Sequence, residues 1–461
     1  MRLFLSAAAL LLVLAGCDPS DDLVIDTPDA QRFRIDIENV APAFGVLKSG
    51  VFNTPVGADG PGPIGPGGAY EFSFTAGPNV TPGSGMRLSF ATMFIQSNDL
   101  FYTFPADGLA LYSDDGTART GDVTGDVLLY DAGTEVNQEP GVGADQAPRQ
   151  GGPDTGAAEN GVLGRIEDGA ADRAGFSYPD AADVIRVTLA HDGEAEFTVR
   201  IENVSTPTAL ATSTGPVAVP LSPGGWAVHV DAVDFFTGGE AAPDWVEAIA
   251  EDGNPAPFAA AFGPLTGVTV PLSPGAVVVH SDAVDFFTSG EAASEGIEAI
   301  AEDGNPAPLA AALAGAAGID VLEVFNTPVG ADGPGPIGPG GSYSVTVDAQ
   351  PGARLSFATM FVQSNDLFYT FEGDGLALFD ASGTPVSGDL TSQVFLYDAG
   401  TEVNQEPGVG DAQVIRQPGP DAGTAENGVL GRIEDGATDR AGFSYPDAAD
   451  VIRITVTPIG S

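Results

Sequence analysis

Two acidic turns are the part of this sequence best suited to chemistry. Ser97-Asn98-Asp99 ends one apolar strand-like stretch, and Asp131-Ala132-Gly133-Thr134-Glu135 ends another. Ca²⁺ prefers six to eight oxygen ligands from carboxylates, amide carbonyls and backbone on converging loops. We therefore expect Asp99, Asp131 and Glu135 to share one calcium ion, although no EF-hand spacing occurs. The alternative is that both turns are simply solvated.

Both turns are written a second time. MFIQSNDLFYTF at 93–104 returns as MFVQSNDLFYTF at 360–371, and YDAGTEVNQEPGVG at 130–143 is repeated without change at 397–410. The repeats predict a second, equivalent ion site at Asp366, Asp398 and Glu402. The aromatic residues beside the first turn of each pair are candidates for ligand contact, with core packing as the alternative: Phe101, Tyr102, Phe368 and Tyr369.

Catalytic motifs are scarce, which favours a protein that is not an enzyme. The three histidines are His191, in a joint, and His229 and His280, at one position of two sister repeats. We interpret a single histidine on an apolar strand as structural. No Gly-x-Ser-x-Gly elbow occurs, and the glycine-rich segment 60–68 lacks the Lys and Ser/Thr of a phosphate-binding loop. With 64 acidic residues, pairs of carboxylates arise by chance.

The first residues, MRLFLSAAALLLVLAGC, are typical of an export signal with a bacterial lipobox. We predict a lipoprotein signal peptide at 1–16, lipidation of Cys17, and an anchor linker at 17–32. An ordinary secretory signal with an incidental cysteine is the alternative. Cys17 is the only cysteine, so disulfides are excluded, and no later apolar run reaches 18 residues. The predicted location is the cell envelope, periplasmic or surface-facing, with the choice of inner or outer membrane left open.

The charge excludes one class of partner. A formal net charge of −48, with Lys48 as the single lysine, would repel a phosphate backbone, so nucleic acid is not expected. The acids are spread along the chain instead of forming a tail. This pattern is typical of a halophilic protein surface, where salt screens the self-repulsion.

Internal repeats define the organisation. An opening strand at 33–40 recurs at 197–204, a long segment starting at 51 recurs from 324, and a middle unit at 217–262 is followed by a sister at 268–313. We predict a first, abbreviated domain at 33–190 and a second domain at 197–461 that holds both middle units. Either one middle unit packs against the first body and completes it, or the second unit is an inert duplication.

The fold class follows from short alternating stretches separated by Gly, Pro and Asp clusters. Residues 87–94, 108–112 and 184–188 alternate with period two, which predicts antiparallel β-sandwiches. Residues 239–251 place Trp245, Val246 and Ile249 at helical spacing, so one short helix per middle unit is expected, ended by Pro255 and Pro257. The fold class is therefore all-β with one or two short helices, and residues 132–161 form a surface loop.

The ordered motifs resemble a known family. FTVRIENV, VPLSPGGWAVH, AEDGNPAP, FNTPVG, SFATMFVQSNDLFYTF, LYDAGTEVNQEPG and YPDAADVIRIT look like the spondin N-terminal domain of bacterial surface proteins, in two copies, the first without the middle unit. The resemblance implies a C2-like β-sandwich that binds calcium at one end and mediates adhesion. It assigns the calcium ligands to the same acids, Asp99, Asp131 and Glu135, and to Asp366, Asp398 and Glu402. The cysteines of the animal domains are absent, and their integrin partners do not carry over.

Together these features predict a membrane-anchored, extracytoplasmic binding or adhesion protein with calcium-stabilised loops. Its partners would be the membrane, through Cys17, and an unknown protein or glycan. An enzyme acting on envelope polymers and a purely structural envelope component are the two alternatives.

Overall fold

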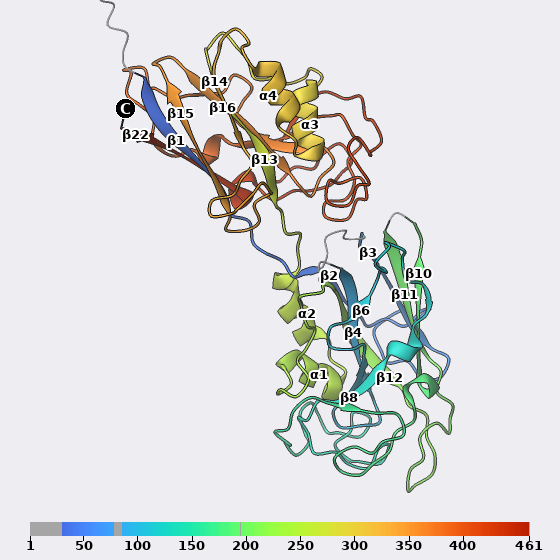
Figure 1. Ribbon diagram of the computed structural model, residues 1–461. Coiled ribbons are helices and arrows are strands. Elements are labelled where there is room, and N and C mark those ends of the chain that lie inside the picture. The colour runs from blue at the N-terminus through green and yellow to red at the C-terminus, as the bar shows by residue number, and fades with distance from the viewer. Residues whose placement is uncertain (1–29, 78–84, 194, 461) are drawn as a thin grey trace, which may run out of the picture.

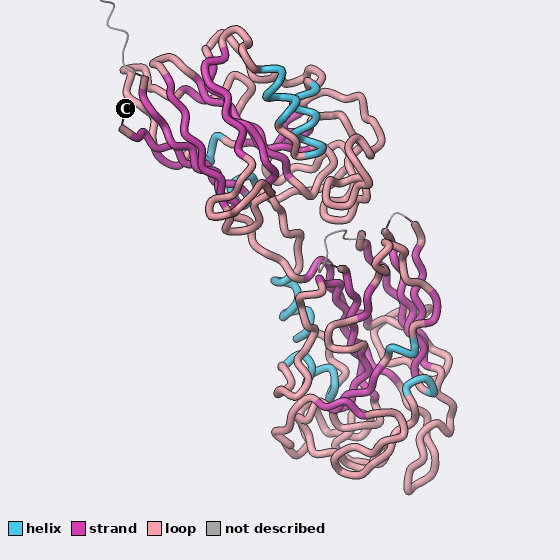
Figure 2. Tube along the Cα trace, viewed as in Figure 1, coloured by secondary structure: helices cyan, strands magenta, loops and turns pink. Residues whose placement is uncertain are grey.

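The computed structural model describes residues 30–77, 85–193 and 195–460. The predicted signal peptide, Cys17 and nearly all of the predicted anchor linker lie outside these residues. Within the described chain, no helix is both long enough and apolar enough to cross a membrane. Two bodies, each built mainly of strands, are joined by two chain crossings (Figure 1, Figure 2).

Body I, residues 45–267, is a sandwich of two antiparallel sheets. Its smaller sheet has the order β3 (Ala69–Thr75), β11 (Glu196–Asn203), β10 (Ile185–His191), β7 (Gly121–Asp122). Its larger sheet has the order β2 (Val46–Phe52), β12 (Leu221–Val230), β4 (Met86–Phe94), β5 (Leu100–Thr103), β8 (Leu128–Asp131), β9 (Gly164–Ile166), with β6 (Leu109–Ala110) against β4.

Body II, residues 30–44 and 268–460, repeats this plan. Its smaller sheet has the order β15 (Ser342–Ala349), β1 (Gln31–Asn39), β22 (Ile452–Ile459), β19 (Gly388–Asp389). Its larger sheet has the order β14 (Ile319–Phe325), β13 (Leu272–His280), β16 (Arg354–Phe361), β17 (Leu367–Thr370), β20 (Phe395–Asp398), β21 (Gly431–Ile433), with β18 (Leu376–Ala377) against β16. The predicted antiparallel all-β sandwich class is confirmed.

Two helices cover the outer face of each larger sheet. These are α1 (Asp244–Asp252) and α2 (Ala256–Phe262) in body I, and α3 (Glu295–Asp303) and α4 (Ala307–Leu313) in body II. Trp245, Val246 and Ile249 are buried as expected. The prediction of one helix per unit was wrong: Gly253, at φ 61°, ends α1, and Pro255 precedes a second helix. Proline fits a first helical turn, so it starts α2 instead of only ending α1.

Short helical turns complete the described elements. They are η1 (Thr124–Asp126), η2 (Ala181–Asp183), η3 (Gly263–Leu265), η4 (Thr391–Gln393) and α5 (Ala448–Val451).

Each body has two apolar layers, one between the sheets and one beneath the helices. The short strand β5 serves both, because successive side chains of a strand point to opposite faces. Tyr102 belongs to the layer between the sheets, and Phe101 to the layer under α1 and α2.

The strand pairing corrects the predicted domain boundaries at 33–190 and 197–461. β1 does not join the long segment that follows it. It lies between β15 and β22, whereas β11 lies between β3 and β10 in body I. The two opening strands have thus exchanged bodies. The two opening strands have similar sequences, so either could pair in either body. The ends of body I lie together, with Val46 paired to Thr266. For this reason β1, which precedes body I, remains close to β13, which follows it.

The first middle unit completes body I. Its strand β12 pairs with both β2 and β4. This supports the alternative in which one middle unit packs against the first long segment. The order in body II is opening strand, middle unit, long segment, and the order in body I is long segment, opening strand, middle unit. Body I is therefore a circular permutation of body II, inserted between β1 and β13.

Candidate metal centres

The ladder between β5 and β8 brings the two predicted turns of body I together. Asp99 directly precedes β5, Asp131 ends β8, and Leu100 pairs with Asp131. Ligand oxygens of Asp99, Asp131 and Glu159 all lie within 4.8 Å of one another. The predicted proximity of Asp99 and Asp131 is correct, and Glu159 is the third acid.

Asp99 is the centre of this site and is completely buried. Its Oδ2 accepts hydrogen bonds from the backbone N–H groups of Thr134 (2.8 Å) and Glu135 (3.1 Å). Its Oδ1 is buried and has no hydrogen-bond partner. A buried carboxylate oxygen without a partner carries a large desolvation cost, so Asp99 needs either a proton or a cation.

Asn137 adds a second unpartnered oxygen. Its Nδ2 donates to Asp131 Oδ2 at 3.0 Å, while its own Oδ1 is buried without a partner. An amide oxygen is a good ligand for a hard cation. The site therefore offers three carboxylates, and an amide group with an unpartnered oxygen is hydrogen-bonded to one of them.

Glu135 does not take the predicted role. Its backbone N–H bonds Asp99, but its carboxylate accepts from Gly156 N (2.7 Å) and Asn98 Nδ2 (3.1 Å). A Cβ at position 156 would lie 2.0 Å from Glu135 Oε2, so any larger residue there would displace the Glu135 carboxylate. The backbone N–H of Glu135 faces Asp99, so its side chain points away from Asp99. The carboxylate of Glu135 stabilises the loop through Gly156 and Asn98 instead.

Body II repeats the arrangement atom for atom. Asp366, Asp398 and Glu426 form the corresponding acidic group, and the Oδ1 atoms of Asp366 and Asn404 are again buried and unpartnered. Glu402, like Glu135, accepts from a glycine N–H, that of Gly423 at 2.7 Å, and lies outside the group.

The electrostatics of the two centres favour a divalent cation. Burial, followed by the charge of Asp131, raises the pKa of Asp99 to about 7, and burial with Asp398 does the same for Asp366. Arg173 lies 3.4 Å from Glu159, and Arg440 lies 3.0 Å from Glu426. Three ionised carboxylates against one guanidinium leave two negative charges at each centre, which a divalent cation would balance.

Sequence reasoning missed Glu159, Glu426 and the two asparagines. Glu159 lies in a long loop without regular strands, so no strand end indicated its position. The available signal was repetition, because Glu159 falls within a block, residues 158–188, that recurs at 425–455 with few changes.

The four candidate contact aromatics are in the wrong place for contact. Phe101, Tyr102, Phe368 and Tyr369 are all completely buried. Phe101 packs against Tyr130 and Phe236, and Tyr102 against Phe94. Because β5 and β17 are interior strands with both faces covered, their side chains fill the cores, as the alternative stated.

The paired histidines are likewise interior. His229 and His280 are completely buried, and each Nε2 is hydrogen-bonded to a serine hydroxyl, Ser89 at 3.0 Å and Ser356 at 2.9 Å. Burial lowers the pKa of His229.

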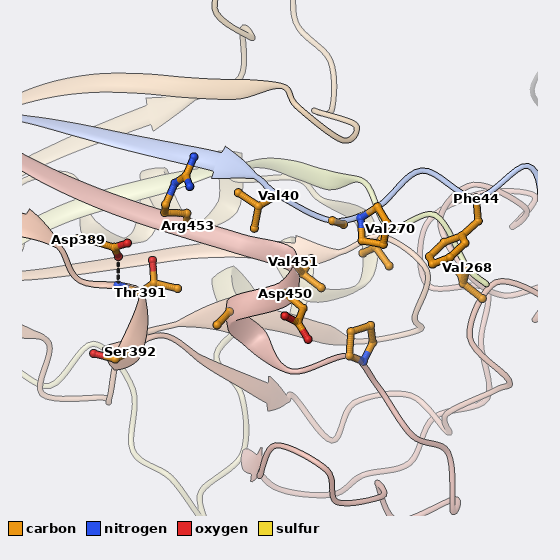
Figure 3. A pocket seen from close by; sticks show the side chains of 14 residues that line it. Val40, Phe44, Val268, Val270, Asp389, Thr391, Ser392, Asp450, Val451 and Arg453 are labelled. Carbon is orange, nitrogen blue, oxygen red and sulfur yellow. Dashed lines mark hydrogen bonds between the residues drawn. The ribbon is translucent and has the colours of Figure 1, made fainter. Parts of the chain in front are cut away.

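A cavity of about 810 Å³ lies where the two crossings leave body II (Figure 3). Val40, Phe44, Val268 and Val270 form its apolar wall, and Asp450 and Arg453 its polar side. Arg453 is ion-paired with Glu38. The cavity therefore presents a mixed surface with its one guanidinium already paired.

No model of a known protein family matches the chain, and no curated protein matches it.

Proposed function

We propose that this protein is an extracytoplasmic binding or adhesion protein whose two sandwiches each hold a calcium ion in loops at one end. The supporting observation is the completely buried Asp99 Oδ1, which has no partner and recurs as Asp366 Oδ1 in the second body. Hard oxygen ligands and a residual double negative charge suit Ca²⁺.

Calcium would act here by fixing loops. Asp99, Asp131 and Glu159 come from three separate segments, and a cation between them would cross-link these segments at the end of the sandwich. Four protein groups leave further coordination positions for water or for an oxygen of a ligand.

The wider setting rests on sequence. The resemblance to spondin N-terminal domains supports a C2-like sandwich used in adhesion, and the lipobox-like segment supports a lipid anchor at Cys17 in the cell envelope. The ligand class, protein or glycan, is left open by these features.

Calcium titration of residues 18–461, the chain without its predicted signal peptide and lipidated Cys17, tests the proposal. In isothermal titration calorimetry at high KCl, we expect two equivalents of bound Ca²⁺. Free calcium at 100 times Kd adds about 2.7 kcal/mol to the stability of each body, which corresponds to a rise in Tm of roughly 5–10 °C for a body of this size.

The isosteric variants Asp99→Asn and Asp366→Asn should each lose one equivalent, and the double variant both. Glu135→Gln keeps the three ligand carboxylates and serves as a matched control for the loss of one acidic charge. Undiminished calcium binding in the double variant, or none in the wild type, would refute the proposal.

A further inference from the structure

The loop at residues 398–413 of body II begins at the candidate metal centre. Asp398 is one of its acids, and Asn404 donates to Asp398 Oδ2 at 3.1 Å. Asn365, next to Asp366, accepts a hydrogen bond from Gln405 N at 3.0 Å. The root of the loop is therefore attached to the same groups that would bind the cation.

The tip of this loop contacts body I. Glu406 is ion-paired with Lys48, the only lysine of the chain, and accepts from Thr75 Oγ1 at 2.7 Å. Val409 is 3% exposed and belongs to the apolar core cluster of body I. A Cβ on Gly77 would lie 2.2 Å from Val409 O, so the two backbones approach closely. Figure 1 shows this loop of body II above β3.

The matching loop of body I, residues 131–146, contacts a different segment of the chain. Its Glu139 accepts from Ser213 N (2.5 Å) and Ser213 Oγ (2.8 Å). Ser213 lies in the direct connection between β11 and β12. In body II the corresponding connection, from β1 to β13, is body I itself. In both bodies, therefore, the loop contacts the part of the chain that connects the opening strand to the middle unit.

The partners of Glu406 are particular to body I. Lys48 and Thr75 are replaced by Val321 and Asp348 at the matching positions of body II. Neither replacement could donate a hydrogen bond or a positive charge to a glutamate. The contact is therefore specific to this pair of surfaces and does not follow from duplication alone.

We propose that cation binding at Asp366, Asp398 and Glu426 controls how body I is held on body II. This inference rests on the proposed function. Without a cation, mutually repelling carboxylates loosen the root of the 398–413 loop. Glu406 and Val409 then lose their fixed position, and the two bodies move relative to each other on their two crossings.

Distance measurement between the bodies tests this directly. Residues 18–461 contain no cysteine, so Val56→Cys in body I and Val329→Cys in body II, both at exposed positions, accept spin labels on this protein. Pulsed dipolar spectroscopy should give a narrow distance distribution with Ca²⁺ and a severalfold broader one with chelator.

Matched variants exist in the two bodies. Asp366→Asn should broaden the distribution even with calcium present, whereas Asp99→Asn, which also loses one equivalent, should not. Glu406→Gln should broaden it while both equivalents still bind, and Glu139→Gln should leave it narrow.

The outcomes separate the two proposals. If two equivalents bind and chelator does not change the distribution, the coupling is refuted and the proposed function stands. Equal broadening by Asp99→Asn and Asp366→Asn also refutes the coupling. If no calcium binds, both proposals fail.

Discussion

Glu251 on α1 and Glu302 on α3 are carboxyl groups packed beneath the loops that carry the metal centres. Each is 3% exposed. Burial, opposed by a hydrogen bond from the Thr134 or Thr401 hydroxyl, raises the pKa of both to about 8. The negative charges of Glu135, Glu247 and Asp99 raise the pKa of Glu251 further.

The raised pKa values of Glu251 and Glu302 predict how the stability of the protein depends on pH. Because the folded pKa lies above the unfolded value, the folded state binds more protons between pH 4.5 and 8, and stability falls as pH rises through this window. Glu251→Gln with Glu302→Gln should raise Tm at pH 9 by several degrees and change it little at pH 5. Thermal melts in chelator measure this. The exposed Glu323→Gln controls for surface charge, and an equal gain at both pH values would contradict the prediction.

Among individual residues, the sequence predicted the acids that directly follow strands and no others. Asp99 and Asp131 stand where alternating stretches stop, and a β-ladder brings such positions together. Glu135 was chosen because it is near Asp131 in sequence. The direction of its side chain depends on the turn, in which its N–H faces Asp99, and spacing does not reveal that.

Between each larger sheet and its helices, the sizes of the facing side chains are complementary. Gly225 on β12 faces Phe258 on α2, and a Cβ there would lie 2.4 Å from the phenyl ring. The matching residues of body II are Ala276 and Leu309, both buried in one cluster. A smaller strand residue accompanies the larger helix residue, so each body keeps a filled interface.

This complementarity can be tested by exchange. Gly225→Ala should destabilise body I by about 1–3 kcal/mol through overpacking. Adding Phe258→Leu, which recreates the pair of body II, should recover a large part of that loss in a double-mutant cycle. Denaturant unfolding gives the free energies. Additive losses would show that the two residues do not share the space.

Element prediction succeeded where period and burial agreed. The alternating stretch at 87–94 corresponds to β4 and that at 184–188 to β10. The stretch at 108–112 forms only the two-residue strand β6, because its partner β4 lies against it at just two positions. The second helix was missed because its prolines were interpreted only as terminators.

At the scale of the whole molecule, the insertion predicts which fragments fold. Residues 45–267 contain both sheets and both helices of body I, so this fragment should unfold cooperatively on its own. Residues 33–190 lack β11, β12 and the helices, so they should remain largely unfolded. Circular dichroism and amide NMR dispersion distinguish these results. A folded 33–190 fragment would contradict the strand pairing.

The repeats revealed two bodies but not their membership. Comparing the sequence with itself shows that the opening strand, the middle unit and the long segment each occur twice. It does not show which copy of one pairs with which copy of another. The exchange of β1 and β11 is possible because the two ends of body I lie next to each other, with Val46 paired to Thr266. Asn39, at the end of β1, is thereby close enough to donate a hydrogen bond from its Nδ2 to Val270 O at 2.8 Å. Such proximity in space is not written in any local pattern.

The paired ends of body I also predict an order of folding. While body I is unfolded, β1 is tethered to its partners by more than 200 residues, and closing so long a loop costs conformational entropy. Once body I has folded, Val46 and Thr266 are neighbours and the tether becomes short. β1 leaves the ribosome first among the described strands, yet we expect it to join its sheet last, after the inserted body has formed and β15 and β22 have been made.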